Sequence, residues 1–135
     1  MGGIRLGLAA VVCLVGPVAP AGAASFPCSR PTLTATEMAI CRDPQLSKLD
    51  EETARKAKAL LRRLSYGQYL GLRYWQSRSA EAREQCGPDR ACLAARYRAQ
   101  NRVLDSMLQC LDSGARRRTC WRAVVDGGRS VALPR

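Results

Sequence analysis

The stretch Cys86-Gly87-Pro88-Asp89-Arg90-Ala91-Cys92 decides the fold of this chain, because it ends one helical pattern and begins another. Gly87 and Pro88 terminate the first pattern, since glycine is favoured just past a helix end and proline cannot continue a helix. Asp89 is a preferred N-cap residue, so the next helix is expected to begin directly after it. The chain therefore folds back on itself at a turn flanked by two cysteines.

A second corner with the same features lies upstream. Thr34-Ala35-Thr36-Glu37 matches a capping box, so a short helix is expected from there to about Cys41. Asp43 can cap the following helix, and Pro44 suits its first position because the missing N–H costs nothing there. We expect the two corners to lie at the same end of a helical hairpin, which would gather four cysteines.

Three longer helices are expected, from Pro44 to about Leu64, from about Gln68 to Gln85, and from Asp89 to about Leu108. Each carries one stripe of inward-facing residues at spacings of three and four. The stripes are Leu46, Leu49, Thr53, Ala57, Leu60 and Leu64; Leu72, Trp75, Ser79, Ala82 and Cys86; and Leu93, Tyr97, Gln100, Leu104 and Met107. Short connections predict an all-α fold, a small antiparallel bundle of one short and three longer helices with an irregular C-terminal tail.

Residues 1–24 have the composition of a secretory signal peptide, with an apolar core from Leu6 to Val18 and small residues that suit cleavage after Ala23 or Ala24. Lipidation at Cys13 is the alternative, but the preceding Val12 is larger than such a site normally has. The sequence thus predicts a periplasmic or secreted protein without a membrane span, with a domain over residues 25–109 and a basic extension over 110–135. Removing the leader removes Arg5 and no acidic residue, so the net charge of +11 becomes +10.

Six of the seven cysteines lie beyond the leader, and in an exported chain an even number indicates disulfides. The last long helix would hold Cys92 and Cys110 about 27–30 Å apart, whereas a disulfide needs Cα atoms about 4.4–6.8 Å apart. Cys110 should therefore pair with Cys120. Pairs Cys28–Cys41 and Cys86–Cys92 are favoured among the remaining four, although Cys41–Cys86 is open too.

Nothing in the sequence indicates an enzyme, a metal site or a cofactor. The chain has no histidine, which argues against zinc and against the usual general base. The acidic pairs Glu81 with Glu84 and Asp50 with Glu51 lack any recognisable catalytic context. Cys86 and Cys92 are too far apart for a Cys-x-x-Cys redox motif.

Two segments together resemble the lysozyme-inhibitor LprI-like family. They are Phe26-Pro27-Cys28 with Glu37-Met38-Ala39-Ile40-Cys41-Arg42-Asp43-Pro44, continuing to Asp50, and Arg83-Glu84-Gln85-Cys86 with Asp89 and the run from Ala91 to Tyr97. The resemblance covers about residues 26–105. It implies a small disulfide-stapled helical domain of the bacterial envelope that binds a protein, with a lysozyme as the expected target of inhibition.

The chain departs from that family at three inward positions. Thr53 and Ala57 stand where the family often has Leu and Tyr, and Ser79 stands where it often has Trp. Trp75 lies one turn earlier and should face the region of Ala57. We expect Trp75 to point into the core and fill the volume that the smaller residues leave, because cores tolerate repacking at constant volume.

Two groups of residues are candidate binding sites. Arg116, Arg117 and Arg118 lie in the expected Cys110–Cys120 loop beside Trp121, a combination suited to phosphate or carboxylate groups. The alternative is a solvated loop with Trp121 packed against the bundle. Residues suited to contacting a protein partner are Tyr66, Tyr69, Tyr74, Glu51 and Glu52.

Three functions compete. The first is a protein-binding module, a lysozyme inhibitor or a relative of one, although a chain of charge +10 would be repelled by a cationic lysozyme. The second is an envelope protein that binds an anionic polymer or membrane surface through its basic faces, without specific nucleic-acid recognition. The third is a structural accessory domain with no ligand.

Overall fold

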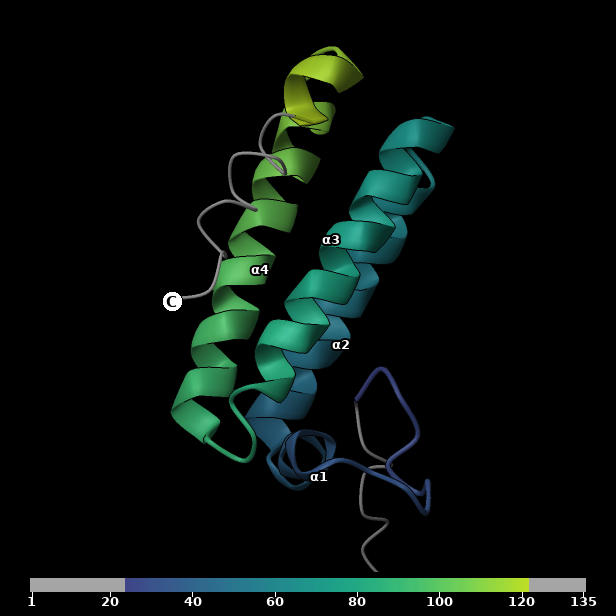
Figure 1. Ribbon diagram of the computed structural model, residues 1–135. Helices are drawn as coiled ribbons and strands as arrows, with labels where there is room; N and C mark the ends of the chain where they lie inside the picture. The colour runs from purple at the N-terminus through teal and green to yellow at the C-terminus, as the bar shows by residue number, and fades with distance from the viewer. Residues whose placement is uncertain (1–23, 122–135) are drawn as a thin grey trace, which may run out of the picture.

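A computed structural model describes residues 24–121, which form a small helical bundle (Figure 1). Its helices are α1 (Ala35–Arg42), α2 (Pro44–Leu61), α3 (Tyr66–Glu84) and α4 (Arg90–Asp112). A further helical turn covers residues 117–121, and no strand occurs within the described part of the chain. The predicted all-α, disulfide-stapled bundle is confirmed. The details differ at the ends: α2 stops three residues earlier than predicted, α4 runs four residues further, and part of the expected tail is helical.

The helix starts follow from local capping. Thr34 and Glu37 form the predicted capping box of α1, and the Asp43 carboxylate accepts hydrogen bonds from the backbone N–H of Gln45 at 2.8 Å and of Leu46 at 3.2 Å. Asp89 likewise accepts from the N–H of Cys92 at 3.0 Å. Each bond satisfies an N–H group that has no partner inside its helix. These caps fix where the chain changes direction.

Helices α2 and α4 are parallel and form the main interface of the bundle. Helix α3 runs in the opposite direction and leads from the end of α2 to the start of α4. The register is read from contacts between polar side chains. Tyr97 bonds Asp50, Asn101 bonds Thr53 at 2.9 Å, and Asp105 bonds Lys56, so partners are separated by 47 to 49 residues. A nearly constant separation is the signature of parallel elements, because both chains advance in the same direction. The arrangement is therefore up, down, up.

The buried core consists of two apolar clusters. One lies beside α1 and contains Ile40, Leu46, Leu93 and Tyr97; the other fills the opposite half of the bundle and contains Ala57, Leu60, Leu72, Trp75, Leu104, Met107, Leu111 and Cys120. Trp75 is 8 % exposed and shares its cluster with Ala57, so its predicted inward position is confirmed. Full burial of one leucine or methionine contributes about 1.5–3 kcal/mol, so these side chains dominate the stability.

Three disulfides close the chain locally: Cys28–Cys41, Cys86–Cys92 and Cys110–Cys120. The predicted Cys110–Cys120 pair is confirmed, and the open choice among the other four cysteines resolves to the two local pairs. Cys86 packs against the cluster that contains Ile40, the residue before Cys41, so these four cysteines do gather at one end. Three disulfides indicate an oxidising compartment. Within residues 24–121, no helix has the length and apolar character needed to cross a membrane.

Candidate functional site

The outer face of α3 presents large side chains to solvent. Tyr66 is 77 % exposed and Tyr74 70 %, and between them lie the partly exposed Tyr69 and Leu70. The rings of Tyr66 and Tyr69 are stacked, with centroids 6.4 Å apart. Helical spacing explains the grouping, because residues 66, 70 and 74 recur every four positions while Leu72, Trp75 and Ser79 occupy the buried side. Leu70 belongs to this face although sequence reasoning did not single it out.

The arginine residues 116–118 lie on a short turn beyond α4. Gly114 has a φ of +80°, the left-handed conformation that reverses the chain after a helix, and the Cys110–Cys120 disulfide closes the turn. All three arginines are exposed, and no ion pair within residues 24–121 involves them. The turn thus offers three adjacent guanidinium groups without acidic neighbours bound to them.

Contacts with α3 hold this turn in place. The side-chain amide of Gln68 donates a hydrogen bond to the backbone carbonyl of Arg117 at 3.2 Å. Trp121 packs against the larger apolar cluster and lies so close to Gly71 that a β-carbon there would meet Trp121 Cζ2 at 2.5 Å. Trp121 therefore serves to attach the turn to α3, which corresponds to the packed alternative considered from the sequence.

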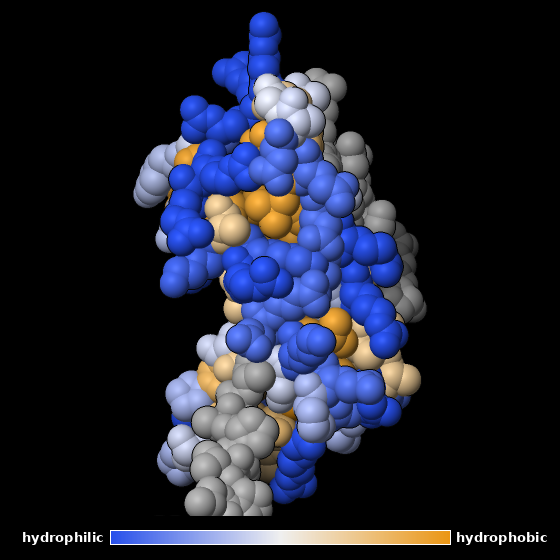
Figure 2. All heavy atoms as spheres, turned by 180° about the vertical axis from the view of Figure 1, so that it is seen from behind, coloured by the Kyte–Doolittle hydropathy of each residue, from blue (hydrophilic) through white to orange (hydrophobic). Residues whose placement is uncertain are grey.

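The arginine turn contacts the same helix that carries the exposed tyrosines, because Gln68 of α3 holds Arg117 and Gly71 of α3 lies against Trp121. We call Tyr66, Tyr69, Leu70, Tyr74, Arg116, Arg117 and Arg118 the arginine–tyrosine surface. Seen from the side opposite Figure 1, the molecule is covered mainly by hydrophilic residues, with smaller hydrophobic areas between them (Figure 2). The arginine–tyrosine surface combines both kinds of group at one end of the bundle.

The acidic residues predicted to contact a partner are not part of this surface. Glu52 forms an ion pair with Lys56 at 2.6 Å, and Lys56 also contacts Asp105 of α4 at 2.7 Å. Burial alone would lower the pKa of Lys56, but its bonds with Asp105 and Glu52 outweigh burial and raise that pKa. Glu51 is exposed on α2. Glu52 thus has a role at the junction of α2 and α4, and residues 24–121 contain no cluster of metal-ligating side chains.

A buried polar network near α1 was missed by sequence reasoning. Asp50 is only 5 % exposed and accepts a hydrogen bond from the Tyr97 hydroxyl at 2.8 Å. Burial raises the pKa of the Tyr97 hydroxyl above its usual value. The guanidinium of Arg83 lies 4.6 Å from the centre of the Tyr97 ring and bonds Gln100 at 2.5 Å. The signal available was the position of Asp50, one helical turn beyond the inward-facing Leu46.

No protein-family model, no curated protein and no solved structure matches the chain. The similarity to the LprI-like family therefore remains a prediction that depends on the residues quoted above.

Proposed function

We propose that this protein is an exported binding module that attaches to a protein partner through the arginine–tyrosine surface. The observation that carries this proposal is the exposure of Tyr66, Tyr69, Leu70 and Tyr74 on α3, the helix against which the turn with three exposed, adjacent arginines packs. Tyrosine and arginine are enriched in protein interfaces and among the residues that contribute most to binding energy. Export agrees with the three disulfides and with the predicted leader.

The charge of this surface restricts its partner. Three arginines side by side favour a surface that carries carboxylates around an apolar centre, because unlike charges speed association and like charges oppose it. A lysozyme is the partner class that the family resemblance suggests. A strongly cationic lysozyme fits poorly with the charge of +10 that remains after removal of the leader, so a neutral or acidic lysozyme is the better target.

The test is inhibition of lysozymes by the oxidised protein. Lysozymes of several classes, from cationic to acidic, would be titrated with it, and residual muramidase activity measured over a series of salt concentrations. We expect stoichiometric inhibition of one of the less cationic enzymes. Absence of inhibition for every class at every salt concentration would reject the lysozyme assignment.

Matched variants locate the binding face. Y66A/Y74A removes two rings that are largely exposed and contribute little to folding, so it should weaken binding at least tenfold while leaving stability nearly unchanged. R116A/R117A/R118A should weaken binding and reduce its salt dependence. R55A/R98A/R102A removes the same charge from exposed positions on α2 and α4 and should leave binding almost intact. If R116A/R117A/R118A and R55A/R98A/R102A weaken binding equally, the partner does not bind specifically at the arginine–tyrosine surface.

The arginine turn alone favours a second function, binding of an anionic polymer. Guanidinium groups pair with phosphate in a bidentate manner, and these three make no ion pair within residues 24–121. Inorganic polyphosphate is a suitable probe. Saturable binding that R116A/R117A/R118A abolishes and Y66A/Y74A leaves unchanged would favour this function over the protein partner.

A further inference from the structure

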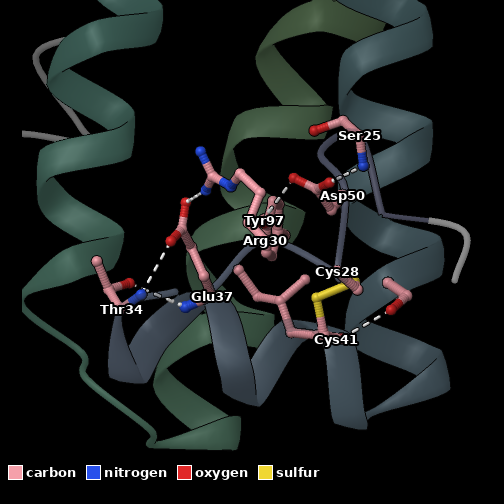
Figure 3. The surroundings of a disulfide bond; sticks show 10 residues. Ser25, Cys28, Arg30, Thr34, Glu37, Cys41, Asp50 and Tyr97 are labelled. Carbon is pink, nitrogen blue, oxygen red and sulfur yellow. Dashed lines mark hydrogen bonds and ion pairs between the residues drawn. A yellow bond between two sulfur atoms is a disulfide. The ribbon is translucent and has the colours of Figure 1, made fainter. Parts of the chain in front are cut away.

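The carboxylate of Asp50 has no cationic partner although it is almost completely buried. Its two oxygens accept one hydrogen bond each, from the Tyr97 hydroxyl at 2.8 Å and from the backbone nitrogen of Ser25 at 2.5 Å (Figure 3). No ion pair within residues 24–121 includes Asp50. A buried carboxylate is costly unless a positive charge compensates it. The nitrogen of Ser25 already contacts this carboxylate, so a positive charge on that nitrogen would compensate Asp50.

Ser25 is held at this position by the structure that follows it. The Cys28–Cys41 disulfide attaches the segment to α1, and Phe26 packs against the cluster that contains Ile40 and Tyr97. Arg30 lies over the Phe26 ring and also pairs with Glu37 of α1. These contacts hold the segment from Phe26 to Arg30 against α1 and so keep the Ser25 nitrogen beside Asp50.

We propose that the bond between Ala24 and Ser25 is the processing site, and that the new amino group of Ser25 forms an ion pair with the buried carboxylate of Asp50. A leader peptidase would hydrolyse this bond, with water supplying one oxygen of the new Ala24 carboxylate and two protons to the released Ser25 nitrogen. The Ser25 nitrogen then changes from a neutral amide to an ammonium group. The inference rests on the export included in the proposed function but not on the identity of the partner.

Cleavage one residue earlier would give a different arrangement. The side chain of Ala24 also packs against the α1 cluster, so a chain that begins at Ala24 keeps its packing. Its ammonium group would lie one residue away from Asp50, and the neutral Ser25 amide would remain bonded to the buried carboxylate. The packing of Ala24 therefore favours the longer chain, whereas charge favours the chain that begins at Ser25.

The first measurement is the amino-terminal residue of the full chain after export from a bacterial host, read by mass spectrometry. We expect the processed protein to begin at Ser25. A processed protein that begins at Ala24, or a chain that is exported without cleavage, would overturn the proposal.

The second measurement tests the ion pair through a cycle of four oxidised proteins, each ending at residue 135. Two begin at Ser25 and two at Ala24, and one of each pair carries Asp50→Asn, which keeps the shape of the side chain and removes its charge. Unfolding by denaturant would be followed at about pH 6, below the usual range of an α-amino pKa. We expect the Ser25 chain to have a folded-to-unfolded ratio at least about tenfold above that of the Ala24 chain, with the difference lost in D50N.

Equal stability of the Ser25 and Ala24 chains with Asp50 intact would overturn the proposal, as would a difference that persists in D50N. If D50N does not fold, two results still test the proposal. They are the amino-terminal residue of the processed protein and the difference in stability between the Ser25 and Ala24 chains with Asp50 intact. Because neither measurement involves a partner, failure of lysozyme or polyphosphate binding leaves this test unaffected.

Discussion

The indole ring of Trp121 lies directly against the α-carbon of Gly71, where a β-carbon would come within 2.5 Å of Cζ2 and 2.8 Å of Cη2. No larger residue fits at position 71 unless the ring moves. The contact attaches the turn beyond α4 to the first half of α3, the helix that carries the exposed tyrosines.

Substituting Gly71 with alanine should therefore displace Trp121. We expect G71A to lower the free energy of unfolding by about 1–3 kcal/mol, the usual cost of overpacking, because the clash exceeds the gain in helix propensity. Denaturant unfolding gives the energy, and tryptophan fluorescence reports the displaced ring.

Gly67 provides the matched control, because it lies in the first turn of the same helix and a β-carbon there meets nothing within 4 Å. G67A should be neutral or should raise stability by up to about 1 kcal/mol. Destabilisation of the same size in both variants would show that the cost arises from the helix rather than from Trp121.

Removal of the Cys110–Cys120 disulfide should release the turn while the bundle stays folded. C110S/C120S should cost about 2–4 kcal/mol and reduce binding through the arginine–tyrosine surface, because the arginines lose their fixed position. Circular dichroism would measure the remaining helix. C86S/C92S removes a loop closure at the opposite end and should leave binding unchanged; loss of binding in that variant too would point to general unfolding.

Stability should decrease in acid through Asp43. Slight desolvation raises the pKa of its carboxyl, but hydrogen bonds from the N–H of Leu46 and Gln45 and pairing with Arg90 outweigh it, so the pKa lies below the usual 3.8. A depressed pKa means that the contribution of Asp43 is present above about pH 4 and is lost as the pH falls through the lower folded-state value. The stability difference between wild type and D43A should shrink over this window in denaturant titrations. E51A, at an exposed position, should follow the wild-type pH dependence.

Stability should also decrease in strong alkali through Tyr97. Burial raises the pKa of its hydroxyl, and the neighbouring Asp50 raises it further, so the unfolded chain ionises first as the pH rises above about 10. The contribution is therefore complete below pH 10 and is lost above it. Y97F should show a shallower alkaline decline.

Y97F should also be less stable at neutral pH by about 1–3 kcal/mol, because it removes a donor from the buried Asp50 carboxylate. Y66F, at a residue that is 77 % exposed, should match the wild type in both respects. An unchanged alkaline slope in Y97F would contradict the assignment of that decline to Tyr97.

The helices could be predicted because their boundaries are encoded locally. Thr34 with Glu37, Asp43 and Asp89 each satisfy orphan N–H groups within three residues, so no tertiary information is needed. The predicted inward stripe of α3 likewise includes every residue that is buried in that helix. One such signal was missed: Ser65 and Gln68 form a capping box, which explains why α3 begins at Tyr66.

The buried polar residues and the candidate surface could not be predicted in the same way. The partners of Asp50 and Thr53 lie 47 and 48 residues away, and a helical period does not reveal which polar residue will meet another. The attachment of the arginine turn to α3 depends on Gln68 and Gly71, whose roles appear only once α3 and residues 117–121 are packed together. The sequence identified both groups of residues but not the contact between the arginine turn and the helix that carries the tyrosines.

The parallel register of α2 and α4 has a consequence for how the chain folds. All three disulfides close short loops, with sequence separations of 13, 6 and 10, and none joins α2 to α4. The principal interface therefore connects segments almost fifty residues apart, which raises the contact order above that of a helical hairpin. Bringing these distant segments together costs chain entropy before the contacts between α2 and α4 stabilise the fold. Folding should be slower than is usual for a helical bundle, and cysteine oxidation alone should accelerate it little.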